Sequence, residues 1–161
     1  MDMLFEIGVI IFLTFIPTLE LRASIPYGIF SSSIHWSLVF IVAVVANIVL
    51  APIVYIFLNK FVHMFFRFSK FHRFYHKNVE LVQNKIHKNV EKYGEYGLAL
   101  FIGVPLPGSG VYTGVLAGYC VGLDYKRTMI ASVFGVLIAG ILVTVISLSG
   151  NGIFNIFLKG V

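Results

Sequence analysis

The sequence has little charge. Only 12% of its 161 residues are Asp, Glu, Lys or Arg, whereas 58% are hydrophobic and the mean hydropathy is +0.92. Roughly a quarter of the residues of an average soluble domain are charged, and the run 38–58 contains no charge at all. These deficits argue against a water-soluble core, and they predict one integral membrane domain over 1–161.

Cysteine is also scarce. The single Cys120 excludes an internal disulfide framework and a cysteine-rich metal site. The first apolar run carries Asp2 and Glu6 where a signal peptide has basic residues, and no small-residue cleavage site follows it, so we expect it to remain in the fold. His72 and His76 stand four apart without a carboxylate or cysteine at ligand spacing, so we expect interfacial histidines, no metal and no other cofactor.

Two long apolar runs, 38–58 and 128–148, match the roughly 20 residues with which a helix crosses a bilayer. Four shorter apolar runs flank segments that are rich in Pro, Gly or charge: 3–16 and 25–30 around TLELRAS, and 98–104 and 111–123 around PLPGSG. Irregular backbone at membrane depth survives only when it is buried in protein or faces a water-filled cavity. We therefore predict two re-entrant hairpins, with pairs of short full spans as the alternative.

The two halves of the chain share one hydropathy pattern. A shift of 88 positions places Pro17 on Pro105 and the first long run on the second. Because a re-entrant hairpin returns to its starting side and the long helix crosses once, the second half begins on the opposite side of the membrane. This parity predicts an inverted repeat.

The predicted fold is an all-α integral membrane protein in which each re-entrant hairpin precedes a long transmembrane helix. The expected segments are a first hairpin over 1–36, a transmembrane helix over 37–58, a connector over 59–97, a second hairpin over 98–123, a transmembrane helix over 126–149 and an interfacial tail over 150–161.

The connector is basic and aromatic. It holds eight of the twelve Lys and Arg residues and four of the five histidines, and phenylalanines alternate with them at helical spacing. This pattern predicts amphipathic helix at the membrane surface, attracted to anionic lipid heads. Nucleic-acid binding is disfavoured, because the phenylalanine face would be costly in water. The positive-inside bias predicts a multi-pass protein of the cell membrane with a cytoplasmic connector and both termini outside.

Glu20 and Arg22 are the most informative polar residues, because they lie in the first break. An ionisable group at membrane depth costs roughly 2.5 to 3.5 kcal/mol on insertion scales. One interpretation is a structural salt bridge that ties the hairpins together. The other is that Glu20 binds and releases a proton or cation while Arg22 grips an anionic head group. Since Glu20 is the only acid clearly in the predicted membrane core and no histidine lies in the breaks, we expect no enzyme.

The second break, PLPGSG, contains no charged residue, so its expected binding groups are backbone N–H groups. Its Gly-Ser-Gly segment can present unpaired N–H groups beside a half-helix N-terminus, although the GK[ST] of a P-loop is missing. We predict that the tips, 17–26 and 105–114, form a polar pocket near the membrane midplane. Its expected members are Pro17, Glu20, Arg22, Pro26, Pro105, Pro107, Gly108, Ser109, Gly110 and Tyr112.

Small residues recur at helical spacing in the second half and predict close helix packing, with a homodimer as a further expectation. They are Gly114, Gly118, Ala131, Gly135 and Ala139. Asn47, in the middle of the first long run, is expected to link helices by hydrogen bonding.

The segments IPTLELRASIPYGIF and PLPGSGVYTGVLAG resemble the E-L-R-x-x-I-P and P-x-P-G-[ST]-G segments of the putative small multidrug export protein family of archaea and bacteria, a relative of the DedA/VTT superfamily. In that superfamily the second segment has the form P-G-x-R-x-x-x-P-x-x-A-G. Pro107, Gly108, Ala117 and Gly118 fit it, but Gly110 replaces the arginine and Gly114 the proline.

The resemblance implies paired re-entrant hairpins that meet in mid-membrane and, for superfamily members, movement of phospholipids or polyprenyl phosphates between leaflets. In this chain any head-group chemistry would rest on Arg22 from the other hairpin. We expect a transport protein that moves an anionic lipid or lipid-linked phosphate, with membrane lipids as partners. The alternatives are a proton-coupled exporter of cationic drugs and a scaffold that does not transport.

Overall fold

The computed structural model describes residues 3–17, 19–65, 94–105 and 108–159, and every regular element in these ranges is helical. The named helices are α1 (Met3–Phe15), α2 (Glu20–Ser31), α3 (Trp36–Phe65), α5 (Val111–Val121) and α6 (Tyr125–Lys159). Residues 94–103 form a further helix that leads to the second break. The expectation of an all-helical chain is confirmed for the part of the chain that the structure describes.

Two of these helices are long and apolar enough to cross a membrane. The candidate spans are Trp36–Lys60, with 25 residues, and Tyr125–Gly150, with 26, and both have a mean hydropathy of 2.7. The helices α1, α2 and α5 have 13, 12 and 11 residues. At 1.5 Å per residue they are about 16 to 20 Å long, short of the roughly 30 Å hydrocarbon core.

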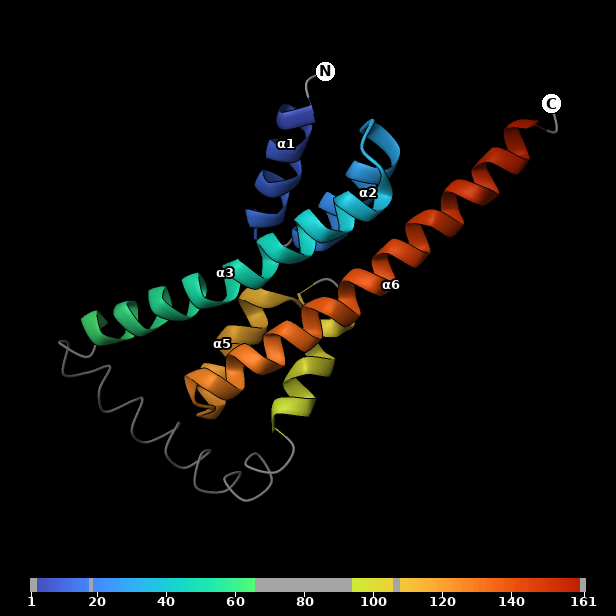
Figure 1. The fold of residues 1–161 in the computed structure, drawn as a ribbon. Helices are drawn as coiled ribbons and strands as arrows, with labels where there is room; N and C mark the ends of the chain where they lie inside the picture. The colour runs from blue at the N-terminus through green and yellow to red at the C-terminus, as the bar shows by residue number, and fades with distance from the viewer. Residues whose placement is uncertain (1–2, 18, 66–93, 106–107, 160–161) are drawn as a thin grey trace.

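The first break is short. Helix α1 ends at Phe15, and Pro17 follows after one residue. Proline cannot donate to the helix, and it disfavours helical backbone in the residue before it. The chain turns at Ile16 and Pro17, and α2 runs back beside α1 (Figure 1). The second half repeats the order of short helix, break, short helix, turn and long helix.

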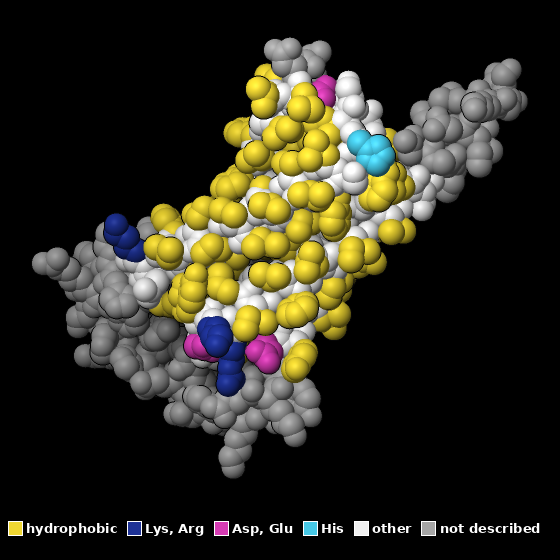
Figure 2. All heavy atoms as spheres, viewed as in Figure 1, with side chains coloured by type: hydrophobic (Ala, Val, Ile, Leu, Met, Phe, Trp, Pro, Cys, Tyr) yellow, Lys and Arg dark blue, Asp and Glu magenta, His cyan; other side chains and the backbone are white. Residues whose placement is uncertain are grey.

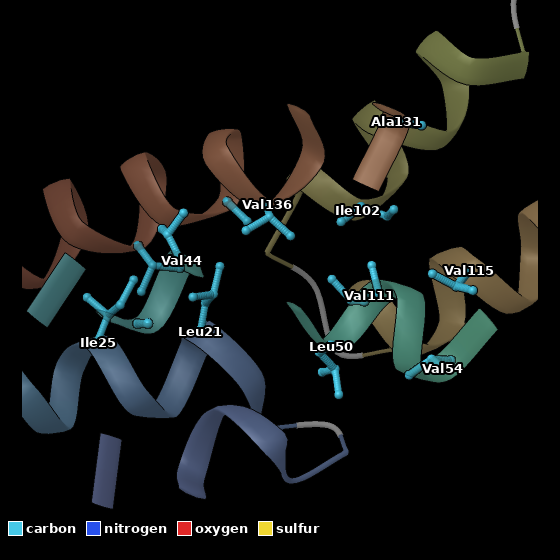
Figure 3. Packing of buried hydrophobic residues seen from close by; sticks show 14 of the residues in the cluster. Leu21, Ile25, Val44, Leu50, Val54, Ile102, Val111, Val115, Ala131 and Val136 are labelled. Carbon is cyan, nitrogen blue, oxygen red and sulfur yellow. The ribbon is translucent and has the colours of Figure 1, made fainter. Parts of the chain in front are cut away.

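The long helices lie at the centre of the packing. Helices α3 and α6 contact each other, and each also contacts short helices from both halves: α3 packs on α1, α2 and α5, and α6 packs on α5 and α2. Figure 3 shows Leu21 of α2 and Val136 of α6 directed toward one another within this core. The halves therefore share one core, which brings the two breaks together.

Hydrophobic side chains cover the outside as well as the inside. Figure 2 shows them over most of the visible face of the described residues, with charged side chains gathered near the ends. Leu4, Ile56 and Ile146 are each more than 60% exposed. A soluble protein rarely exposes so large an apolar surface, whereas lipid solvates it readily.

Two predicted boundaries differ from those in the structure. Helix α3 continues to Phe65, into the predicted connector, and α6 continues through the predicted tail to Lys159. Neither segment contains a proline that would end the helix. The basic and aromatic pattern over 66–93, with His72 and His76, lies outside the described residues.

Candidate functional site

Glu20 lies where the two breaks meet. Its carboxylate accepts hydrogen bonds from the first two backbone N–H groups of α5, at 3.0 Å from Val111 N to Oε2 and 3.3 Å from Tyr112 N to Oε1. The residue is 8% exposed. N–H groups in the first turn of a helix have no partner within the helix, and the helix dipole favours negative charge there. Glu20 therefore binds the second hairpin as an anion would.

Arg22 makes the second link between the breaks. Its guanidinium donates to the backbone carbonyl of Ser109 and, at 2.9 Å, to the Ser109 hydroxyl. That hydroxyl donates to the carbonyl of Val104, where the preceding helix has ended. The Ser109 side chain thus connects the Arg22 guanidinium to the Val104 carbonyl, which lies just before the second break.

Tyr112 makes a third link in the opposite direction. Its hydroxyl donates to the carbonyl of Phe15, the last residue of α1, at 2.6 Å. Carbonyls at a helix C-terminus need partners from outside the helix. Each break region therefore supplies hydrogen-bond partners to backbone groups at a helix end of the other. We call these three links the tip contact.

Gly110 makes room for the tip contact. It precedes α5 with φ 150° and ψ −173°, a backbone conformation that is essentially restricted to glycine. A Cβ added there would lie 2.5 Å from Glu20 Oε2 and 2.9 Å from Glu20 Cδ. Glycine at this position lets the carboxylate reach the helix end.

A small cavity of about 10 Å³ adjoins the tip contact. This volume accommodates one water molecule. Its walls come from α2, α3, α6 and the segment before the second break, and they comprise Glu20, Leu21, Arg22, Asn47, Ile102, Pro105, Val136, Ala139 and Val143. Asn47 is 1% exposed, and its Oδ1 has no hydrogen-bond partner within the described part of the chain.

The family described as "Putative small multi-drug export protein" matches residues 20–142, about three quarters of the chain. The chain belongs to this family. No curated protein and no solved structure matches it. The match begins at Glu20, directly after the first break, and covers the second break and all of α5, so among the groups of the tip contact only the Phe15 carbonyl falls outside it. The family description and the two long apolar helices together identify this chain as a membrane protein.

This small multi-drug export family member brings together most of the predicted pocket residues. Pro105 lines the cavity, and Pro17 lies exposed in the first break. Gly108 has φ 86°, and nothing lies within 4 Å of a Cβ added there. Pro107 lies outside the described residues.

Pro26 corrects one prediction. The first tip was predicted to extend over 17–26, but Pro26 lies inside α2, which already begins at Glu20. A proline inside a membrane helix removes only its own N–H donor, and neighbouring groups can compensate for that loss. The break is therefore shorter than 17–26, and Glu20 and Arg22 project from the first turn of a helix.

The small residues predicted for packing lie at close helix contacts. Cβ atoms added at Gly114 and Gly135 would overlap Ile102, and one added at Gly118 would come within 2.9 Å of Leu98 Cδ2. Ala131 and Ala139 of α6 are buried. These residues let the helix over 94–103 approach α5 and α6 closely.

The structure differs from the sequence-based expectation at two buried polar residues, Glu6 and Asn47. Glu6 is 2% exposed and accepts a hydrogen bond from Ser33 N at 3.1 Å, so Glu20 is not the only buried acid of the first hairpin. Asn47 was expected to cross-link helices, yet no described residue donates a hydrogen bond to its Oδ1. A polar residue in an apolar run marks both positions, but hydropathy alone does not reveal their partners.

Proposed function

We propose that this chain is an inverted-repeat transporter whose two hairpins are re-entrant. The short arms support the first part of this proposal, because none of α1, α2 and α5 is long enough to cross the hydrocarbon core. The directions of the long helices support the second part. Helix α3 runs away from the side on which α1 begins, and α6 runs back toward it (Figure 1).

The charges near the helix ends support a cytoplasmic location for the start of α6. Lys126 and Arg127 lie in its first turn, and Arg127 pairs with Asp124 at 3.5 Å. Tyr55 contacts Tyr125 at the same end, with ring centroids 5.0 Å apart, as aromatic residues do at membrane interfaces. Basic residues in short loops favour the cytoplasm, so both termini would lie outside.

We infer that the cargo is an amphiphile with an anionic head group, such as an anionic lipid or a lipid-linked phosphate. The tip contact is the observation that carries this inference. Arg22 supplies a planar cation suited to phosphate or carboxylate, and the N-terminus of α5 supplies backbone donors suited to an anion. The likeness of the second break to the DedA/VTT pattern supports the same cargo.

The structure represents a closed arrangement in this proposal. The cavity at the tips has room for one water molecule and not for a head group. Cargo would enter when the tips separate, and the three links of the tip contact would close again behind it. Glu20 would take up a proton when its carboxylate leaves the amides of α5, because an unpaired charge at this depth is costly.

The test is lipid movement in liposomes. The wild-type protein should speed the exchange of a labelled anionic lipid between leaflets, and Glu20→Gln and Arg22→Ala should slow it at least tenfold. Arg127→Ala, a charge change outside the tip contact, is the matched control and should leave the rate unchanged. Equal rates for all four proteins would contradict the roles assigned to Glu20 and Arg22.

Export of a cationic amphiphile is a second candidate, favoured by the family description and by a lateral cavity of about 520 Å³. Glu95, Tyr96 and Phe134 line this cavity, so it combines one carboxylate with aromatic and apolar surface. Efflux of a lipophilic cation from vesicles that depends on a pH gradient and is lost in Glu95→Gln would favour this candidate. Exchange of labelled lipid without any gradient favours the first.

A further inference from the structure

The anion position at the start of α5 is already occupied. The Glu20 carboxylate takes both N–H groups, at Val111 and Tyr112, that a phosphate oxygen would use. The α2 helix carries Arg22 two residues further on, and its guanidinium reaches the same break. A second anion can bind the α5 amides only after Glu20 leaves them.

Asn47 offers Glu20 a second hydrogen-bond partner. Its buried Oδ1 has no hydrogen-bond partner among the residues that the structure describes, and the side chain lines the same water-sized cavity as Glu20 and Arg22. A carboxylate cannot satisfy this oxygen, because both are acceptors. A protonated carboxyl group can, because it carries an O–H donor. The unpaired oxygen therefore has a suitable partner in only one of the two protonation states of Glu20.

Building on the proposed function, we propose that Glu20 is a two-position switch. Deprotonated, it binds the α5 amides; protonated, it donates to Asn47 Oδ1, and the freed amides with Arg22 bind the phosphodiester or phosphate of the cargo. The O–H proton comes from solvent and stays on Glu20 while the cargo is bound. One negative charge is thus neutralised for each singly charged phosphate group that enters, so the net charge at this depth is unchanged.

The surroundings of Glu20 leave few other groups to titrate. Arg22 from α2 and the Tyr112 side chain from α5 are the charged and titratable groups that face it. Among the described residues, α3, α6 and the helix over 94–103 contribute uncharged side chains to the cavity. The bound state holds one more proton than the free state, so anion affinity should rise as the pH falls.

The experiment measures binding by calorimetry on the purified protein in detergent, between pH 5 and pH 8. The probe is short-chain phosphatidylglycerol, whose single negative charge does not titrate in this range. Short-chain phosphatidylcholine tests the need for net charge, and glycerophosphoglycerol, the same head group without chains, distinguishes a lipid site from a site for free phosphodiesters. Wild-type affinity should fall as the pH rises, by up to about tenfold per pH unit, as expected when one proton accompanies each anion.

Two variants test the two positions of the switch. Glu20→Gln carries an NH₂ that can donate to Asn47 as the protonated acid would, so it should bind tightly at every pH. Asn47→Leu removes the acceptor and should weaken binding about tenfold at a fixed pH, as the loss of one hydrogen bond would. Thr144→Val is the matched control, because Thr144 also has a buried unpaired oxygen but does not line the cavity.

Wild-type binding that does not change with pH, or loss of binding in Glu20→Gln, would overturn the switch. The wild-type profile decides this without any variant, so a poorly folded Asn47→Leu protein does not affect the result. The proposed function is tested separately. Lipid exchange with pH-independent binding refutes the switch alone, whereas pH-dependent binding without lipid exchange refutes the transport role alone.

Discussion

Replacing Gly110 by alanine tests the tip contact most sharply. The new Cβ would meet Glu20 Oε2 at 2.5 Å, and the backbone at φ 150° would be strained for any residue with a side chain. Such strain costs about 1 to 3 kcal/mol. Displacing Glu20 would also remove two charge-assisted hydrogen bonds, each contributing about 1.5 to 3 kcal/mol. If both bonds break, we expect the free energy of unfolding to fall by about 4 to 9 kcal/mol.

Gly108→Ala is the matched control. Gly108 also has a positive φ, 86°, but no atom of the described residues lies within 4 Å of its Cβ position, so only the backbone cost of about 1 to 3 kcal/mol should apply. Thermal unfolding in detergent should therefore show a drop in Tm several times larger for Gly110→Ala. On a Glu20→Ala background the two glycine changes should cost similar amounts, because the contact is gone. Equal drops on the wild-type background would refute the reasoning.

Two further predictions concern packing and the third link. Tyr112→Phe removes the 2.6 Å bond to the Phe15 carbonyl and should lower the unfolding free energy by about 0.5 to 1.5 kcal/mol, measured by denaturant titration. Gly135→Ala places a Cβ 2.8 Å from the Ala99 carbonyl oxygen and should lower Tm, with a cost of about 1 to 3 kcal/mol, whereas Gly8→Ala, with nothing within 4 Å, should raise or maintain it. An unchanged Tm in Gly135→Ala would contradict the close helix contact.

Much of the fold is readable from hydropathy. The two long helices follow from uninterrupted apolar runs, and the positions of the breaks follow from Pro17 and from the glycines around Ser109. Pro26 shows the limit of this reading, because a proline inside a membrane helix looks the same in sequence as one that ends it. Where a helix begins depends on packing as well as on residue type.

Side-chain type predicts only part of the candidate site. Charge at membrane depth singles out Glu20 and Arg22, but their partners are largely backbone groups of the second break, which every residue carries. The unpaired oxygen of Asn47 also depends on which face of α3 meets the cavity. These features require the three-dimensional arrangement of the two halves.

The most direct test of the architecture is which face of the membrane each hairpin end occupies. Single cysteines would replace Leu4, Ser33, Tyr96 and Asp124, all exposed, in a Cys120→Ser background. Labelling of intact cells with an impermeant thiol reagent should modify the cysteines at 4 and 33 from outside and those at 96 and 124 only after permeabilisation. Ends of either hairpin that label from opposite faces would show full spans and contradict the re-entrant inverted repeat.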